Sequence, residues 1–313
     1  MSFAEQVDVF YGRVTHSSAQ VYARVSSLVG GGDWSITGQI RGPVAPGTRT
    51  LPTTIELADL GEGATLLASC SIPDPTFWTT QLPATYDVEV QLHREGELVE
   101  TVSRSLAIRA FGASGRNFLW DSKRWVLRGV SAPVKEFEGL DAFKDNAGVL
   151  VAQSPPESLL RDASLAGVLL VVELSPDDLI AELQRLSLWP AVAIVILPHD
   201  YEVNAELRAS APNLLFAARV DPRSTPQPAK WLDVIICDAS DVERFHDTTK
   251  QWLLPLVAER RLNGDYTLIE ARRECDHLQR DLVPHGDFAG YVVHCGATSR
   301  ADDRAASQGS SPR

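Results

Sequence analysis

Two carboxylates in this sequence directly follow apolar runs. Asp200 comes just after Ala191–Leu197, and Glu259 follows Leu254–Ala258. A short apolar run bounded by turn signals is typical of a strand buried on both faces. Two carboxyl groups that such strands bring together could serve as a general acid and a nucleophile. Taken alone, Asp200 is better explained as the cap of a following helix, because Asp is a preferred N-cap residue.

Four further polar side chains lie at or next to the ends of apolar runs and are candidate substrate-binding residues: Glu173, His199, Asp238 and His294. Glu173 is equally explained as a solvated loop residue or as the ion-pair partner of an arginine. The two histidines with Asp200 and Asp238 could form a metal cluster, but their spacing matches no known metal motif. We therefore expect neither a metal nor a cofactor.

Eight apolar runs follow one another at regular intervals in the second part of the chain, and helical stretches lie between most of them. The runs are Trp125–Val130, Gly148–Ala152, Val168–Glu173, Val192–Leu197, Leu214–Ala218, Val234–Cys237, Leu254–Ala258 and Phe288–Val293. Eight strand–helix units predict a (β/α)8 TIM-type barrel. In such a barrel the active site lies at the carboxyl ends of the strands, where the candidate residues stand.

The predicted barrel is compact, since barrels of this type usually take about 250 residues. The shortening is visible in the connection Arg219–Lys230, whose three prolines leave no room for a good helix. We expect helices at Pro156–Ala163, Pro176–Leu183 and Thr267–Leu282. An open, doubly wound α/β sheet is the alternative architecture.

The first part of the chain alternates apolar and polar residues in short runs separated by turn signals. These runs are Val7–Tyr11, Ala19–Val25, Trp34–Ile40, Thr53–Leu57, Ala64–Cys70, Tyr86–Leu92 and Leu98–Val102. A tight turn at Arg94–Gly96 joins the last two. About seven short strands in roughly 100 residues predict an immunoglobulin-like β-sandwich.

The junction between the two parts is a stretch of small residues at Phe111–Gly115, which we interpret as a linker. We therefore expect an immunoglobulin-like sandwich over residues 1–112 and the barrel over residues 113–296. The polar, small-residue tail 297–313 is expected to be disordered.

Composition narrows the class of protein. The 313 residues are 44% hydrophobic and 22% charged, as in ordinary globular proteins. A net charge of −12 argues against nucleic acid or an anionic membrane as the main partner. The first residues show neither a basic stretch nor an apolar core of a signal peptide, so we expect a cytoplasmic protein. The four cysteines form no C-x-x-C pair and are expected to be free, mostly buried thiols.

Four local sequences resemble glycoside hydrolase family 2, the family of β-galactosidases, β-mannosidases and β-glucuronidases. They are Phe77–Val88, which leads to a Tyr and a sandwich strand; Phe118–Val130, which is similar to the start of the family's barrel; Trp189–Asp200; and Pro255–Glu259. The resemblance runs from about residue 7 to 295. Because family members are longer, we expect a truncated form of that fold.

The resemblance implies a sandwich followed by a catalytic barrel, and it implies roles for two carboxylates. In the family, the Glu after strand four is the acid/base and the Glu after strand seven is the nucleophile of a retaining mechanism. The corresponding positions here are Asp200 and Glu259. The two carboxyl groups of a retaining enzyme stand about 5–5.5 Å apart.

Several positions depart from the family pattern. Asp200 is one methylene shorter than Glu, which retracts the acid by about 1.5 Å, and a misplacement of about 1 Å can cost on the order of a hundredfold in rate. The remaining departures are His199 for Asn, Ser131 for Asn, Val151 and Ala152 in the region of a strand-two Arg, Arg260 and Arg261 for an aromatic and a Gly, and His294 near the place of a Trp.

A preserved scaffold with an altered site favours a glycoside hydrolase-like protein of carbohydrate metabolism whose catalysis is degenerate or lost, and which binds carbohydrate or a protein partner. The alternative is an active retaining β-glycosidase that hydrolyses O-glycosyl bonds with Glu259 as nucleophile and Asp200 as acid/base. The sequence names no sugar and no oligomeric state.

Overall fold

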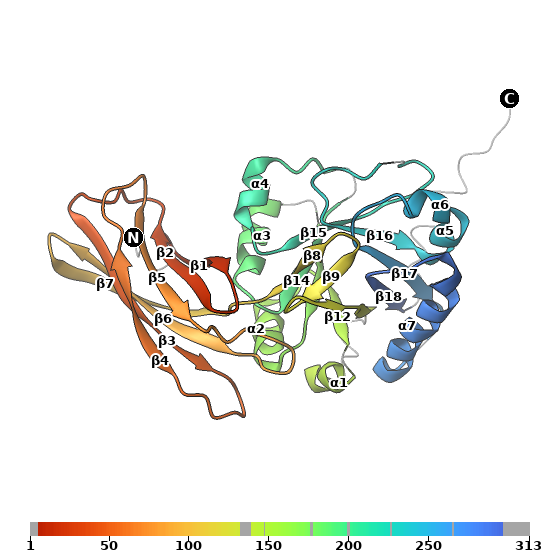
Figure 1. Ribbon diagram of the computed structural model, residues 1–313, viewed down its shortest axis with the longest axis horizontal. Coiled ribbons are helices and arrows are strands. Elements are labelled where there is room, and N and C mark those ends of the chain that lie inside the picture. The colour runs from red at the N-terminus through yellow and green to blue at the C-terminus, as the bar shows by residue number, and fades with distance from the viewer. Residues whose placement is uncertain are drawn as a thin grey trace. The chain divides into compact units, whose positions relative to one another are not determined.

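The computed structural model describes residues 6–131, 139–146, 148–175, 178–198, 201–225, 227–264 and 266–296. It divides into two compact units. The first comprises Met1–Phe111 with Leu160–Gly167 and Gln184–Ala191, and the second comprises Gly112–Leu159, Val168–Leu183 and Val192–Arg313. Figure 1 shows strands alone at the amino-terminal end of the chain and alternating strands and helices in the rest.

The first unit contains one antiparallel sheet of seven strands in the order β1-β2-β5-β4-β3-β6-β7. The sheet curls into a sandwich because β4 pairs with β3 through residues Thr53–Leu57 and with β5 through Ala58 and Asp59. The strands are β1 (Val7–Val14), β2 (Ser18–Val25), β3 (Trp34–Val44), β4 (Thr53–Asp59), β5 (Leu66–Pro73), β6 (Thr85–Arg94) and β7 (Glu97–Leu106). The predicted immunoglobulin-like sandwich is confirmed.

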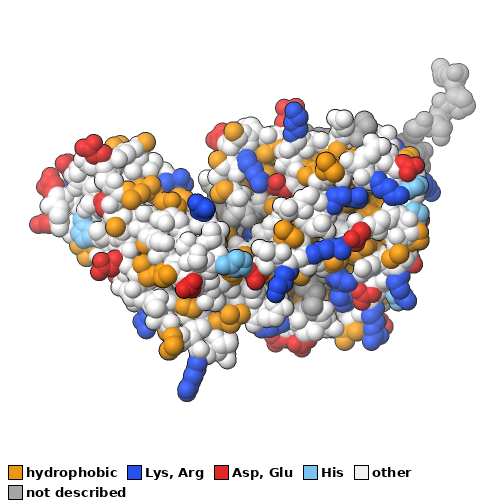
Figure 2. All heavy atoms as spheres, in the orientation of Figure 1, with side chains coloured by type: hydrophobic (Ala, Val, Ile, Leu, Met, Phe, Trp, Pro, Cys, Tyr) orange, Lys and Arg blue, Asp and Glu red, His pale blue; other side chains and the backbone are white. Residues whose placement is uncertain are grey.

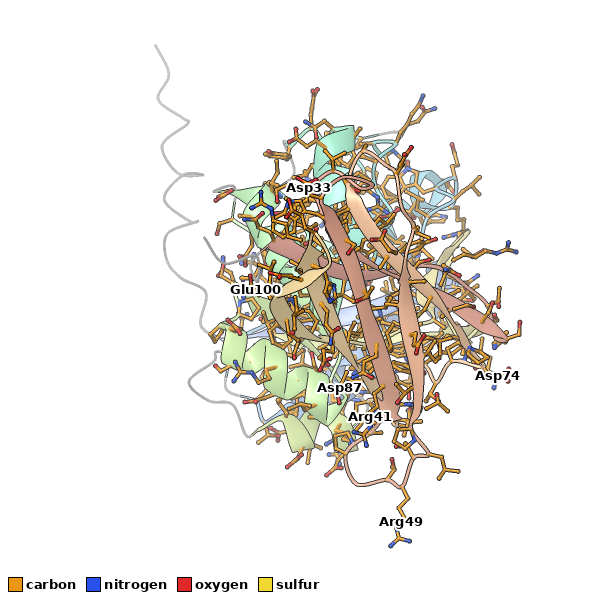
Figure 3. The ribbon with its side chains drawn as sticks, turned by 90° about the vertical axis from the view of Figure 1, so that its left-hand side faces the viewer. Asp33, Arg41, Arg49, Asp74, Asp87 and Glu100 are labelled. Atoms are coloured by element: carbon orange, nitrogen blue, oxygen red, sulfur yellow. The ribbon has the colours of Figure 1, made fainter. Side chains whose placement is uncertain are left out.

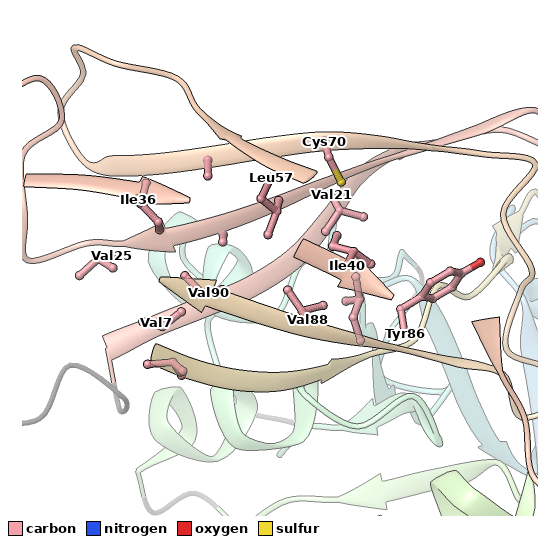
Figure 4. Packing of buried hydrophobic residues seen from close by; sticks show 14 of the residues in the cluster. Val7, Val21, Val25, Ile36, Ile40, Leu57, Cys70, Tyr86, Val88 and Val90 are labelled. Carbon is pink, nitrogen blue, oxygen red and sulfur yellow. The ribbon is translucent and has the colours of Figure 1, made fainter. Parts of the chain in front are cut away.

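The period-two pattern of the sequence places one face of each strand in the sandwich core. In β2 every second residue is buried, and β6 behaves likewise. Figure 4 shows side chains from several strands, among them Val21, Ile40, Leu57 and Val88, gathered in this core. The predicted turn between β6 and β7 is also confirmed, since Glu95 and Gly96 both have the positive φ angles of a two-residue hairpin turn.

Tyr86, at the start of β6, provides a second mark of the immunoglobulin-like fold. Its hydroxyl accepts a hydrogen bond from the backbone N–H of Thr76 at 2.8 Å. A tyrosine at this strand that bonds back to the upstream backbone is the tyrosine corner of such sandwiches.

The outer surface of the unit is charged: Figure 3 shows Arg41 and Asp87, which are cross-strand neighbours, and Arg49 in the loop between β3 and β4.

The predicted linker is wrong in part, because Phe111–Ser114 forms a strand, β8. It belongs to a three-stranded sheet in the order β10-β9-β8, with β9 at Asn117–Trp120 and β10 at Lys123–Trp125. The small residues that indicated a linker are also compatible with a short strand, because β8 pairs with the adjacent strand β9.

The eight remaining strands form a closed parallel barrel. They are β11 (Leu127–Ser131), β12 (Val149–Gln153), β13 (Leu170–Glu173), β14 (Val192–Ile196), β15 (Leu215–Arg219), β16 (Val234–Asp238), β17 (Leu256–Leu262) and β18 (Gly290–Cys295). Closure is direct, since β18 pairs with β11 from Leu127↔Gly290 to Ser131↔His294. The barrel is therefore confirmed, and the open sheet is excluded.

Helices alternate with these strands. They are α1 (Leu140–Asp145), α2 (Glu157–Ala166), α3 (Leu179–Ser187), α4 (Ala205–Ser210), α5 (Ala239–Arg244), α6 (His246–Thr249), α7 (Leu268–Leu282) and the 3-10 turn η3 (Val283–His285). Within the described parts of the connection from β15 to β16 there is no helix, as its prolines predict. No helix among the described residues is long and apolar enough to cross a membrane.

The cysteines are free, and three of them are buried, as predicted. On the face of the molecule in Figure 2, acidic and basic side chains are interspersed with hydrophobic ones. The predicted tail 297–313, the expected helix start at Pro176 and the residues 132–138 after β11 lie outside the described residues.

Candidate functional site

The barrel interior carries polar and charged side chains near the carboxyl ends of four strands. Val171, Val257 and Val292 line a cavity inside the barrel. Side chains two residues apart on a strand face the same way, so Glu173, Glu259 and His294 lie above those valines on the same inner face. Arg219 is the last residue of β15 and reaches the same place.

Arg219 connects two of these residues. Its Nε donates to both carboxylate oxygens of Glu259, at 2.9 and 3.1 Å. Its two terminal nitrogens donate to the two oxygens of Glu173, at 2.5 and 3.1 Å. Because the guanidinium is planar and uses different edges for the two partners, it occupies the space between the two carboxylates.

His294 completes the cluster from β18. Its Nε2 lies 3.0 Å from Oε2 of Glu259. In the pairing of β18 with β17, the residue opposite His294 is Arg261. We call Glu173, Arg219, Glu259 and His294 the barrel cluster. The side chains of Glu259 and His294 are 14% and 20% exposed, and those of Arg219 and Glu173 are 33% and 34% exposed.

The environment keeps Glu259 ionised. Burial alone would raise the pKa of its carboxyl group, but the hydrogen bond with His294 and the positive charge of Arg219 hold that pKa below its usual value. The same contacts with Glu173 and Glu259 raise the pKa of Arg219 against the effect of burial. An ionised carboxylate can act as a nucleophile but not as a general acid.

The interior beneath the cluster is narrow and apolar. Glu259 and His294 are the only polar side chains among those that line it; the others are Leu127, Val151, Val171, Ile194, Ile196, Val234, Ile236, Val257 and Val292. The cavity measures about 10 Å³, which is about enough for one water molecule. A ligand of sugar size therefore does not fit inside this cavity.

Asp238 lies apart from the cluster. It is the next residue in register to Glu259, on β16, but its Oδ1 accepts hydrogen bonds from the backbone N–H of Ser240 at 2.8 Å and from the Ser240 hydroxyl at 2.6 Å. It is the N-cap of α5, which is a common use of Asp at the end of a strand.

His199 and Asp200 lie outside the described residues, so their predicted roles stay predictions. The alternative explanation of Asp200 as a helix cap likewise falls outside the described residues. The next helix, α4, begins at Ala205, and its N-cap is Asn204, whose side chain accepts a hydrogen bond from the backbone N–H of Leu207 at 2.8 Å.

Arg219 was not predicted as a site residue, since in the sequence it stands only at the start of a proline-rich connection. A signal was present, because Arg219 ends an apolar run just as Glu173 ends another. Buried charges in proteins are normally paired, so two carboxylates that face the interior of one barrel call for a cation nearby. For Glu173, the arginine-pair alternative is the one that the structure bears out.

Within the described part of the chain, no group of three or more His, Cys, Asp or Glu side chains could hold a metal ion. Two members of the metal cluster considered above, His199 and Asp200, lie outside that part.

Comparison with known proteins shows a likeness in fold. No protein-family model matches the sequence, and no curated protein matches it. Among solved structures, a calcium-binding mutant of Bacteroides uniformis β-glucuronidase 2 is 15% identical with a TM-score of 0.62, and the match covers 93% of this chain and 46% of that one.

Two further neighbours agree. The β-glucuronidase of Ruminococcus gnavus, in complex with D-glucuronic acid, is 14% identical with a TM-score of 0.63, and the match covers 92% of this chain and 60% of that one. The β-D-glucuronidase of Dictyoglomus thermophilum is 13% identical with a TM-score of 0.62, at 95% and 63% coverage. This chain thus spans about half to three fifths of the neighbours' length. The resemblance to glycoside hydrolase family 2 is confirmed at the level of the fold.

Proposed function

We propose that this chain is a glycosidase-fold protein that binds carbohydrate at the mouth of its barrel and does not hydrolyse it. The observation that carries the proposal is the position of Arg219. A retaining nucleophile must present a carboxylate oxygen to the anomeric carbon. Both carboxylate oxygens of Glu259, the candidate nucleophile, accept hydrogen bonds from Arg219, and Oε2 also lies 3.0 Å from Nε2 of His294.

The charge state of the cluster supports the same conclusion. A glycosidase keeps one carboxyl group protonated so that it can protonate the leaving oxygen. Arg219 and His294 hold the pKa of the Glu259 carboxyl group below its usual value against the effect of burial. Glu259 is therefore not suited to be the general acid, a role left to Asp200, whose side chain is one methylene shorter than Glu.

Support for carbohydrate binding comes from the fold and from the loops that follow two strands. A structural neighbour holds D-glucuronic acid. Tyr201, in the chain after β14, is 36% exposed, and Tyr266, after β17, is 38% exposed. Exposed tyrosines combine an apolar ring face with a hydroxyl that can form hydrogen bonds, which suits the mixed surface of a sugar.

A second candidate function is retaining β-glycoside hydrolysis with Glu259 as nucleophile and Asp200 as acid/base. The lowered pKa of Glu259 favours it, because a nucleophile must be ionised. In that case Arg219 would hold the nucleophile in place rather than keep its oxygens from the sugar.

A panel of aryl β-glycosides (galactoside, mannoside, glucuronide and glucoside) separates the two candidates. We expect no turnover by the wild type, and therefore no difference from Glu259→Gln. Aryl leaving groups need little help from an acid, so a shortened Asp200 would not hide a working nucleophile. Turnover that disappears in Glu259→Gln would contradict the proposal and establish the retaining enzyme.

A further inference from the structure

One arginine at the mouth of the barrel is distinguished from its neighbour by the direction in which it points. Arg260 and Arg261 are consecutive on β17, which pairs with β18 without a register shift from Val257↔Gly290 to Leu262↔Cys295. Successive side chains on an unbroken strand point to opposite faces. Arg261 therefore shares the inner face of Glu259, and Arg260 faces outward.

The contacts of the two arginines agree with this alternation. Arg260 forms an ion pair with Asp281 of the outer helix α7, at 2.9 Å. Arg261 is exposed, and within the described ranges its side chain forms no ion pair or hydrogen bond. Arg261 lies two residues after Glu259 on β17, and it is paired in register with His294 of β18.

We propose that Arg261 binds an anionic group, a carboxylate or a phosphate, on the carbohydrate that the barrel mouth accepts. This inference rests on the proposed carbohydrate binding. A guanidinium is the side chain best suited to bind a planar carboxylate or a phosphate through two hydrogen bonds. Residues two apart on a strand are separated by roughly 7 Å, about the width of a sugar ring, so a ring seated over Glu259 brings a substituent to Arg261.

The charges around the site are compatible with an anion. Glu173 and Glu259 carry two negative charges, and Arg219 compensates one of them. Arg261 supplies a second positive charge on the same inner face. Since Arg219 already binds both carboxylates, Arg261 is, among the residues that the structure describes here, the cation left open to a ligand.

The test is calorimetric titration of the intact chain with glucose, glucuronic acid and glucose 6-phosphate. We expect at least one of the two acidic sugars to bind about tenfold or more tightly than glucose, as a charge-assisted hydrogen bond provides. Arg261→Gln should remove that preference by lowering the affinity for the acidic sugar toward the affinity for glucose. The matched variant Arg260→Gln, whose side chain faces outward, should keep the preference.

The outcomes distinguish the two proposals. Preference for glucuronic acid alone, or for glucose 6-phosphate alone, identifies the anion as carboxylate or phosphate. Equal binding of all three sugars, or a preference that survives in Arg261→Gln, overturns the role of Arg261 while carbohydrate binding stands. Binding of no sugar overturns both.

A salt titration of the wild type gives a second reading that does not depend on any variant. Ionic contacts at an exposed site weaken as salt screens them. Raising NaCl from about 0.05 to 0.5 M should weaken binding of the preferred acidic sugar and leave glucose binding unchanged. The same weakening for both ligands would contradict an ionic contact.

Discussion

The sandwich and the barrel have interiors that differ in one respect. The sandwich core is built of aliphatic side chains and the ring of Tyr86, whose hydroxyl reaches the backbone of Thr76. The barrel interior is equally aliphatic at its lower levels but ends in Glu173, Arg219, Glu259 and His294. Buried charges cost free energy unless they are paired. The presence of these four residues in the barrel is therefore not explained by packing alone.

The largest expected effect comes from truncating one buried isoleucine in each interior. The two variants test whether the aliphatic parts of the sandwich and of the barrel are equally well packed. Ile40 in the sandwich and Ile194 in the barrel are each 1% exposed. Truncation to alanine should lower the free energy of unfolding by about 3 kcal/mol at either site, because it removes buried methyl groups and leaves a cavity. Urea denaturation followed by circular dichroism measures both.

The control is Leu51→Ala, since Leu51 is 92% exposed and its truncation should change stability by less than about 0.5 kcal/mol. A large loss of stability for Ile40→Ala with almost none for Ile194→Ala would show that the barrel interior is loosely packed. The two aliphatic cores would then not be equivalent.

Breaking the barrel cluster is expected to have the next largest effect. Arg219→Met leaves Glu173 and Glu259 facing each other without a cation, and should cost about 2 kcal/mol, less than for a fully buried pair because a third of the side chain is exposed. The triple variant Glu173→Gln, Arg219→Met, Glu259→Gln removes all three charges. It should be more stable than Arg219→Met alone, and the opposite order would contradict the account of the cluster.

The barrel cluster should also give the molecule a pH dependence that its sandwich core lacks. The pKa of Glu259 is lowered in the folded chain from its usual 4.5, so the unfolded chain binds the proton more readily. The stabilisation is then complete above about pH 4.5 and is lost as the pH falls through the folded-state pKa.

The measurement is the difference in free energy of unfolding between wild type and Glu259→Gln from pH 7 down to pH 3. We expect the difference to be constant near neutral pH and to shrink below pH 4.5. Glu243→Gln, at an exposed position of α5, is the control and should show a constant small difference. A Glu259 difference that grows toward low pH would have the wrong sign.

The smallest expected effect concerns the outer support of the barrel. Thr267 caps α7 in a capping box with Glu270, and α7 packs against β11 and β18. Thr267→Ala should lower the free energy of unfolding by about 1 kcal/mol, whereas Thr267→Ser should be close to wild type. Neither should alter the pH dependence that Glu259 causes. A change in that dependence would mean that the cluster depends on the position of α7.

Local sequence patterns were sufficient for most of the fold. The alternation at Ala19–Val25 predicts a strand with one buried face, and the continuous apolar run at Val192–Leu197 predicts one buried on both, and both are observed. The α7 start at Thr267 also follows from local chemistry, since a capping box involves only residues three apart. The strand β8 did not follow, because its small residues are also typical of a linker, although its partner β9 begins at Asn117, close in sequence.

For the site, the sequence determined which residue types end each strand, and the tertiary structure decided which of them meet. Glu173, Glu259 and His294 were named from their positions after apolar runs, yet nothing in their spacing shows that Glu259 lies against His294 and shares a cation with Glu173. Asp238 has the same local signature and caps a helix instead. Arg219 became a site residue only through closure of the barrel, because closure brings strands 40 and 46 residues apart within hydrogen-bond distance.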